Sequence, residues 1–177
     1  MLILFNKPYG VISQFSKHEK YSTLKDYIPH QNVYPAGRLD TDSEGLLILT
    51  DNGAFQNKIS SPNHNIFKTY LVQVENIPNN ASLDILSRGV LIKGVLTKPA
   101  LIRKIDDPDI WPRNPSIRKR KLIPTSWLQI KISEGKNRQV RRMTAAISHP
   151  TLRLIRTQIG EFDINELKPG EYTVIER

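Results

Sequence analysis

Apolar and polar residues alternate in short stretches along the chain, and turn residues separate one stretch from the next. Stretches of about four to eight apolar or alternating residues are typical of strands in a sheet. On this pattern we predict about eight strands, at residues 2–5, 46–49, 68–75, 89–92, 97–105, 126–132, 152–157 and 172–175. The segment 68–75 alternates well enough to have one solvated face.

Four short helices are predicted between these strands, at residues 23–28, from about 52 to 60, at 81–87 and at 137–147. Thr50 or Asp51 is the expected N-cap of the second helix, and Pro62 and Pro150 follow the second and fourth. No regular strand–helix–strand repeat is present, which disfavours a doubly wound parallel sheet. The pattern therefore predicts a mixed α+β protein, with residues 1–177 forming one domain.

The composition narrows the chemistry. The chain has 177 residues and no cysteine, which excludes a disulfide scaffold, a thiolate metal site and a cysteine nucleophile. No apolar run approaches the roughly 18 to 20 residues that cross a bilayer, and the first ten residues do not resemble a signal peptide. We expect a soluble, cytoplasmic protein without a membrane partner.

Charge is distributed unevenly along the chain, and the excess of basic residues in the second half favours a polyanionic binding partner. The formal net charge is +9. Residues 91–177 carry 18 basic and 9 acidic residues, whereas residues 1–90 carry 8 of each. Nucleic acid phosphates would bind such a surface with release of counterions. A solvated cationic face is the alternative interpretation.

Residues 106–124 contain four prolines and the basic run Arg118, Lys119, Arg120 and Lys121. This composition predicts a long surface loop, and long loops in compact domains are often functional.

The segment GRLDTDSEG, residues 37–45, is the first candidate for chemistry. Two glycines bracket an acidic, hydroxyl-rich loop that leads into an apolar strand, so a carboxylate here would lie at a sheet edge within reach of substrate. A tight turn in which these residues serve the backbone is an equally reasonable interpretation. A metal site is a further interpretation, because three carboxylates occur within five residues, at Asp40, Asp42 and Glu44. No histidine or further acid has suitable spacing, and no metal is expected.

Tyr70 is the second candidate. On the predicted strand 68–75 it shares a face with Lys68, Val72 and Val74. Packing into the core is the commoner role of a strand tyrosine. Beside a basic surface, its ring can also stack on an unpaired base.

The third candidate is EGKNRQVRRM, residues 134–143. On a helix starting near Asn137, Arg138 and Arg142 share one face, which a basic solvated surface would explain. Arg141 instead lies close to the apolar stripe that contains Val140. An arginine directed inward requires a carboxylate partner.

These three segments, in this order, resemble the pseudouridine synthases that act on small-subunit and large-subunit ribosomal RNA. GRLDTDSEGLLILT is similar to the catalytic-aspartate motif of the family, and KTYLVQV to its tyrosine motif. EGKNRQVRRM, together with LRLIRTQIG, resembles the third motif of the family. The opening LILFNKPYGVISQFS also resembles the start of the catalytic domain, so the resemblance covers essentially the whole chain. Unlike most relatives, this sequence has no S4-type RNA-binding domain ahead of that domain.

The resemblance implies a pseudouridine synthase fold, with a largely antiparallel mixed sheet, flanking helices and two closely packed subdomains. It implies Asp40 as the essential carboxylate, acting either as nucleophile on the sugar or as base on a ribose proton, with Arg141 as the guanidinium that keeps it ionised. Tyr70 would stack on the base and assist removal of the C5 proton. Leu154 would close the pocket over the uracil. Candidate phosphate contacts are Arg38, Lys136, Arg138, Arg142, Arg118, Lys119, Arg120 and Lys121.

Pseudouridylation detaches uracil, rotates it and rejoins it through C5, which requires no redox change, and we expect no cofactor. The target base must be flipped into a pocket. The expected substrate is a uridine of large-subunit (23S) ribosomal RNA, free or in an assembling particle, and a monomeric protein is expected. Two other functions are considered: a non-catalytic ribosomal-RNA-binding or assembly protein, and a metal-dependent nuclease using Asp40, Asp42 and Glu44.

Overall fold

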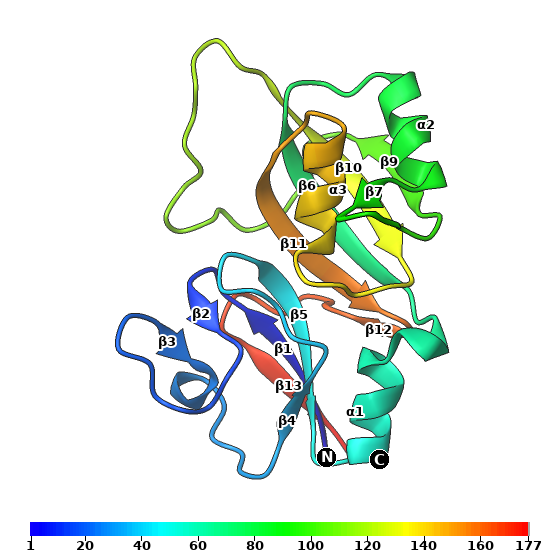
Figure 1. The fold of residues 1–177 in the computed structure, drawn as a ribbon. Helices are drawn as coiled ribbons and strands as arrows, with labels where there is room; N and C mark the ends of the chain where they lie inside the picture. Colours follow the sequence, from blue (N-terminus) through cyan, green and yellow to red (C-terminus); the bar gives the residue numbers. More distant parts are fainter. Residues whose placement is uncertain (177) are drawn as a thin grey trace.

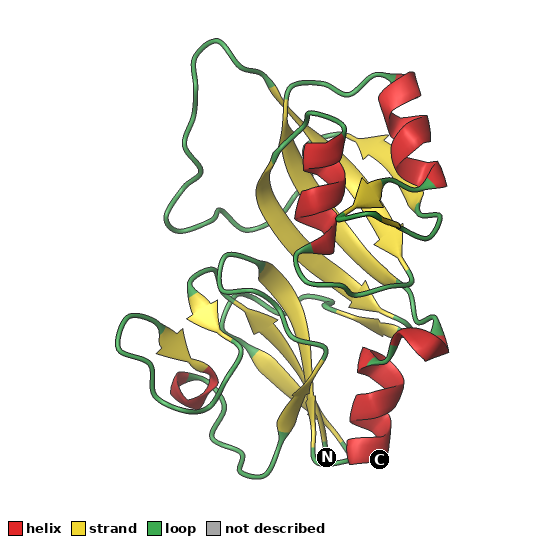
Figure 2. Ribbon diagram, viewed as in Figure 1, coloured by secondary structure: helices red, strands yellow, loops and turns green. Residues whose placement is uncertain are grey.

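The computed structural model describes residues 1–176, which fold into two lobes joined by one continuous sheet (Figures 1 and 2). Within these residues, nine strands form the main sheet, and their bounds are β1 (Leu2–Lys7), β4 (Tyr34–Ala36), β5 (Glu44–Thr50), β6 (Lys68–Glu75), β9 (Leu101–Ile105), β10 (Thr125–Ile132), β11 (Thr151–Ile159), β12 (Phe162–Asp163) and β13 (Tyr172–Ile175). Two small sheets pair β2 (Val11–Ile12) with β3 (Ser22–Thr23) and β7 (Leu91–Ile92) with β8 (Val95–Leu96).

The helices of the described residues are short. The α-helices are α1 (Gly53–Ser60), α2 (Asn80–Arg88) and α3 (Gln139–Ala146), and two 3-10 turns are η1 (Leu24–Asp26) and η2 (Pro62–His64). None of the helices in residues 1–176 is long and apolar enough to span a bilayer.

The order of the main sheet is β13-β1-β5-β11-β6-β10-β9, with β4 on β5 and β12 on β11. Neighbouring strands in this sheet are antiparallel except for β5 and β11, which pair in parallel at Glu44–Ile155 and Gly45–Arg156. This short parallel pairing is the seam between the lobes. The prediction of a mixed, largely antiparallel α+β fold with two closely packed subdomains is confirmed.

Each lobe has its own core. In the first lobe, β1 and β5 are buried on both faces, between one cluster around Leu46 and Ile48 and another around Leu47 and Leu49. In the second lobe, α2 and α3 cover one face of β6, β10 and β11. The strand β11 belongs to both, because Leu154 packs into the second core and Ile159 into the first.

Gly45 is the residue that allows the seam to form. Its φ is +106°, in the region that favours glycine, and a Cβ atom placed there would lie 2.2 Å from the carbonyl oxygen of Arg156. No side chain fits at this position, so the two strands approach closely only because residue 45 is glycine.

Several predicted elements differ in detail. The helix predicted at residues 23–28 is only the 3-10 turn η1, because the chain turns after Tyr27. The N-cap of α1 is Asn52, whose side chain accepts from the Phe55 amide, and not Thr50 or Asp51. Helix α3 begins at Gln139, two residues later than predicted, because Arg138 has a φ of +51° and lies outside the helix.

The segment 106–124 is a long loop, as predicted, and it is attached to the core near its middle. The indole of Trp111 donates to Glu44 Oε1 at 2.9 Å, and Arg153 donates both to that carboxylate and to the Trp111 carbonyl. Arg113 lies over the Tyr9 ring, 4.3 Å from its centroid. The basic run that follows is solvent-exposed.

Candidate active site

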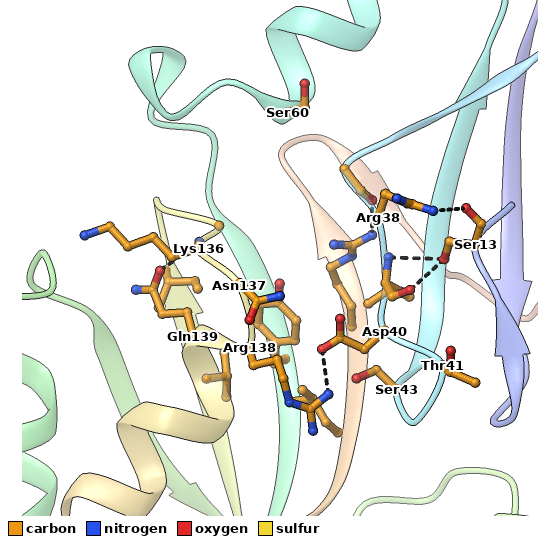
Figure 3. Close-up of a pocket in the computed structure, with 18 of the residues that line it drawn as sticks. Ser13, Arg38, Asp40, Thr41, Ser43, Ser60, Lys136, Asn137, Arg138 and Gln139 are labelled. Atoms are coloured by element: carbon orange, nitrogen blue, oxygen red, sulfur yellow. Dashed lines mark hydrogen bonds and ion pairs between the residues drawn. The ribbon is translucent and has the colours of Figure 1, made fainter. Parts of the chain in front are cut away.

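A pocket of about 520 Å³ lies where the lobes meet, and residues of both lobes line it (Figure 3). The loop between β4 and β5 forms one wall, and the segment from β10 into α3 forms the other. Tyr70 of β6 with Leu154 and Arg156 of β11 also line it. The three segments singled out in the sequence therefore converge on one cavity.

The acidic loop is held in place by contacts with the β2 region. Ser13 Oγ donates to the Leu39 carbonyl at 2.6 Å and accepts from the Leu39 amide, while the Leu39 side chain is buried in the first lobe. Arg38 donates to the Ser13 carbonyl, and the Ser43 amide donates to the Asp40 carbonyl. These contacts fix the backbone on both sides of Asp40 and direct its half-exposed carboxylate toward the other wall (Figure 3).

The guanidinium that meets Asp40 belongs to Arg138. Its Nη1 lies 3.2 Å from Asp40 Oδ2 and 3.1 Å from Asp42 Oδ1, and its Nη2 lies 2.8 Å from Asp42 Oδ2. One side chain thus bridges both carboxylates. The left-handed backbone of Arg138 directs its side chain across the pocket rather than along the outer face of α3.

Arg141 meets the acidic loop at Asp42. It is mostly buried and donates from Nη2 to the Asp42 carbonyl at 2.8 Å, with Asp42 Oδ2 at 3.6 Å. The guanidinium in direct contact with Asp40 is therefore that of Arg138, while the charge of Arg141 lies close enough to interact with Asp40. The reason is the late start of α3, which brings Arg138 to the carboxylates and places Arg141 behind Asp42.

The charged groups of this cluster shift one another's pKa values. Burial raises the pKa of Asp42, but the hydrogen bond and charges of Arg138 and Arg141 outweigh it and leave the pKa below its usual value. The bond to Asp42 raises the pKa of Arg138. Burial lowers the pKa of Arg141, against the opposing charge of Asp42. The two guanidiniums thus favour the ionised form of Asp42 and offset its negative charge.

The three acids of the loop do not converge on a common point. Asp40 and Asp42 meet Arg138, whereas Glu44 is buried and forms a two-bond ion pair with Arg153 at 2.8 and 3.0 Å. No cluster of three or more histidines or acids suited to a metal ion occurs in the part of the chain that the structure describes, residues 1–176.

The remaining predicted residues divide into two groups. Arg38, Lys136 and Leu154 line the pocket. Arg142 does not line it and donates to Asn137 Oδ1. The basic run of the long loop also lies away from the walls of the pocket; its residues are Arg118, Lys119, Arg120 and Lys121. Arg120 Nη1 is 3.7 Å from Glu75 Oε1.

Arg156 and Lys7 were missed by the sequence analysis. Arg156 lines the pocket, pairs with Tyr70 in the sheet, and donates to the carbonyls of Leu46 and Gly37. The fully buried Lys7 donates to the carbonyls of Pro8 and Val11. Both are charged residues within apolar strand sequences, and that position was the signal that could have revealed them.

Comparisons with known proteins agree on one family. Residues 1–146 match the family described as "RNA pseudouridylate synthase". A protein of Vibrio vulnificus named ribosomal large subunit pseudouridine synthase E is 53% identical over 98% of this chain and 74% of its own length. The protein of the same name from Xanthomonas campestris is 49% identical over 98% of this chain and 95% of its own. A solved structure described as a crystal structure of pseudouridylate synthase superposes with a TM-score of 0.82 at 30% identity, covering 99% of this chain and 70% of that one.

Proposed function

The chain belongs to the RNA pseudouridylate synthase family, and from this premise we propose that it converts a specific uridine of large-subunit (23S) ribosomal RNA to pseudouridine. The names of the relatives that share about half of its residues support the choice of RNA. On this proposal the protein works in the cytoplasm as a monomer, on the RNA itself or on an assembling ribosomal particle.

The observation that carries the proposal is the meeting of Asp40, Arg138 and Tyr70 at one pocket between two lobes. Binding of RNA alone requires neither a carboxylate directed into a cavity nor a guanidinium that neutralises it. A pocket of about 520 Å³ is within the range of small-molecule sites and can receive one flipped nucleoside.

The reaction breaks the bond between C1′ and N1, rotates the uracil and forms a bond between C1′ and C5. The C5 proton then leaves and N1 gains a proton, so the atoms balance with no other reactant. Asp40 acts on the ribose, as nucleophile or as base. Arg138 and Arg141 hold the charge and the backbone of its loop.

Tyr70 and Leu154 would form the two apolar contacts of the flipped base. Both are almost fully buried and both line the pocket. The tyrosine ring would stack on the uracil and its hydroxyl would assist loss of the C5 proton. Arg38, Lys136 and Arg142 would contact phosphates near the pocket, and the exposed loop residues Arg118–Lys121 would contact phosphates farther away.

The test uses large-subunit ribosomal RNA from cells that lack this protein, labelled with tritium at C5 of uridine. Wild-type protein should release about one equivalent of tritium per RNA, and Asp40→Asn should release none while binding RNA with little change in affinity. Tritium release by Asp40→Asn at the wild-type rate would refute the role of the carboxylate. Tight binding without release by either protein would instead support a non-catalytic assembly role.

A further inference from the structure

Two buried cations lie close together beside the pocket, and neither has a carboxylate partner among residues 1–176. Lys68 of β6 is 5% exposed and Arg156 of β11 is 3% exposed. Arg156 donates to two backbone carbonyls, which leave its charge unbalanced. Within residues 1–176, no hydrogen bond or ion pair joins the Lys68 ammonium to another residue, and the atom keeps some contact with solvent.

Lys68 lies beside residues that line the same cavity as Tyr70. Side chains alternate along a strand, so the two share one face of β6, about 7 Å apart. Ile132, the residue directly opposite Lys68 in β10, lines the pocket. Gly135 also lines it, and a Cβ atom at that position would lie 3.9 Å from Lys68 Nζ. A side chain at residue 135 would contact the ammonium, and glycine places none there.

Lys7 shows what a buried lysine with a structural role looks like in this fold. Its ammonium donates to the carbonyls of Pro8 and Val11 at 2.9 and 2.7 Å, and its charge is near those of Glu44, Asp42 and Asp40. Lys68 has none of these partners. Burial and then the positive charge of Arg156 lower the pKa of Lys68, with no nearby acid to oppose them.

An unpaired buried cation costs stability unless an anion compensates it. The acids of the pocket are already committed, since Asp40 and Asp42 meet Arg138. An anion from outside the chain would balance the charges of Lys68 and Arg156. We propose that Lys68 and Arg156 form a binding site for a phosphodiester, the one attached to the uridine that stacks on Tyr70. The identity of this phosphate rests on the proposed function.

The site would hold the target nucleotide by its backbone while Tyr70 holds its base. Charge-assisted bonds to phosphate become stronger in a water-poor setting. The cost of keeping two like charges together in the free protein is then recovered when RNA binds, which is the usual trade between stability and function at a binding site.

The test compares Lys68→Met, which preserves side-chain length and burial, with Lys25→Met, which removes the same charge from an exposed residue of η1. Thermal unfolding and the dissociation constant for a large-subunit ribosomal RNA transcript are measured over a range of KCl concentrations. Lys68→Met should unfold at the wild-type temperature or above, and should bind RNA about tenfold more weakly. Its log K against log [KCl] slope should be shallower by about 0.7 to 0.9, the value for one neutralised phosphate. Lys25→Met should retain the wild-type slope, and so should Lys68→Arg, which keeps the charge.

An unchanged slope for Lys68→Met overturns the phosphate site, whatever its unfolding temperature. If that variant does not fold, Gly135→Ala replaces it, because a methyl group there would cover the ammonium at a position without a positive φ. Wild-type RNA affinity of Gly135→Ala would then overturn the proposal. The synthase activity is tested separately, since tritium release by the wild type does not depend on the slope of any variant.

Discussion

Arg138 and Asp40, 98 residues apart in the sequence, meet across the pocket with 3.2 Å between Nη1 and Oδ2. The same guanidinium makes two further bonds to Asp42. The acidic loop of one lobe is therefore neutralised by the other lobe, at the point where the proposed chemistry takes place.

Replacing Arg138 with methionine should weaken both the fold and the reaction. The pKa of Asp42 is lowered in the folded state, so its contribution to stability is present above the unfolded value of about 3.9 and is lost as the pH falls through the folded value. Because Arg138 is 40% exposed, the loss at pH 7 should be only about 0.5 to 1 kcal/mol. Urea unfolding at pH 7, 5 and 3 measures it. The difference between variant and wild type should be equal at pH 7 and 5 and should become smaller at pH 3, and a constant difference would contradict the assignment.

Tyr70→Phe separates stacking from proton transfer. The ring is retained, so the dissociation constant for RNA should change less than about twofold, whereas single-turnover product formation should slow by roughly 100-fold if the hydroxyl transfers a proton. The measurement is tritium release at saturating enzyme. A wild-type single-turnover rate would leave Tyr70 with a stacking role only.

Changing Arg118–Lys121 to serine should alter RNA binding without altering the fold. All four side chains are exposed, and the loop is anchored elsewhere, through Trp111. The slope of log K against log [KCl] should become shallower by about 0.7 to 0.9 for each phosphate that the variant no longer binds, with an unchanged unfolding temperature. The four-serine variant and the wild type would have equal slopes if this loop does not bind phosphate.

Lys7 should make stability depend on pH in the alkaline range. Burial, opposed by Glu44, Asp42 and Asp40, lowers the pKa of Lys7 to about 7, against about 10.4 for an unfolded chain. Between these values the unfolded state binds more protons, so the contribution of Lys7 to the free energy of unfolding rises with pH, by up to about 1.4 kcal/mol per unit. Urea unfolding at pH 7, 8 and 9 should show wild type gaining stability relative to Lys7→Met. The exposed Lys25→Met variant is the control, and parallel pH profiles for wild type and Lys7→Met would contradict the shift.

Gly45→Ala should disrupt the seam between the lobes. A methyl group would overlap the Arg156 carbonyl at 2.2 Å on a backbone with positive φ, and we expect a loss of more than about 3 kcal/mol or failure to fold. Gly53→Ala is the matched control, since no atom lies within 4 Å of its added Cβ, and it should change stability by less than about 0.5 kcal/mol. The measurement is the thermal unfolding temperature of both variants relative to that of the wild type. A Gly45→Ala protein as stable as wild type would show that the strands can separate without cost.

The sequence predicted the parts of the fold that depend on local pattern. Strands such as β5 and β6 were found because their apolar runs or alternation are strong. The partner of Asp40 could not be found in this way, because it depends on one backbone angle at Arg138 that moves the start of α3 by two residues. Arg156 was missed because its significance comes from a neighbour across the sheet, Tyr70, and not from its own segment.

The position of the seam has a consequence for protein synthesis. Asp40 is made early, but the guanidinium that meets it lies 98 residues later, and β11, which joins the lobes, follows α3 in the chain. A ribosome must therefore translate almost the whole sequence before the proposed reaction centre can assemble. A chain that ends before β11 completes neither lobe, because Ile159, Phe162 and Ile164 belong to the first core and β13 pairs with β1. The two lobes are thus completed together, after nearly the whole chain has left the ribosome.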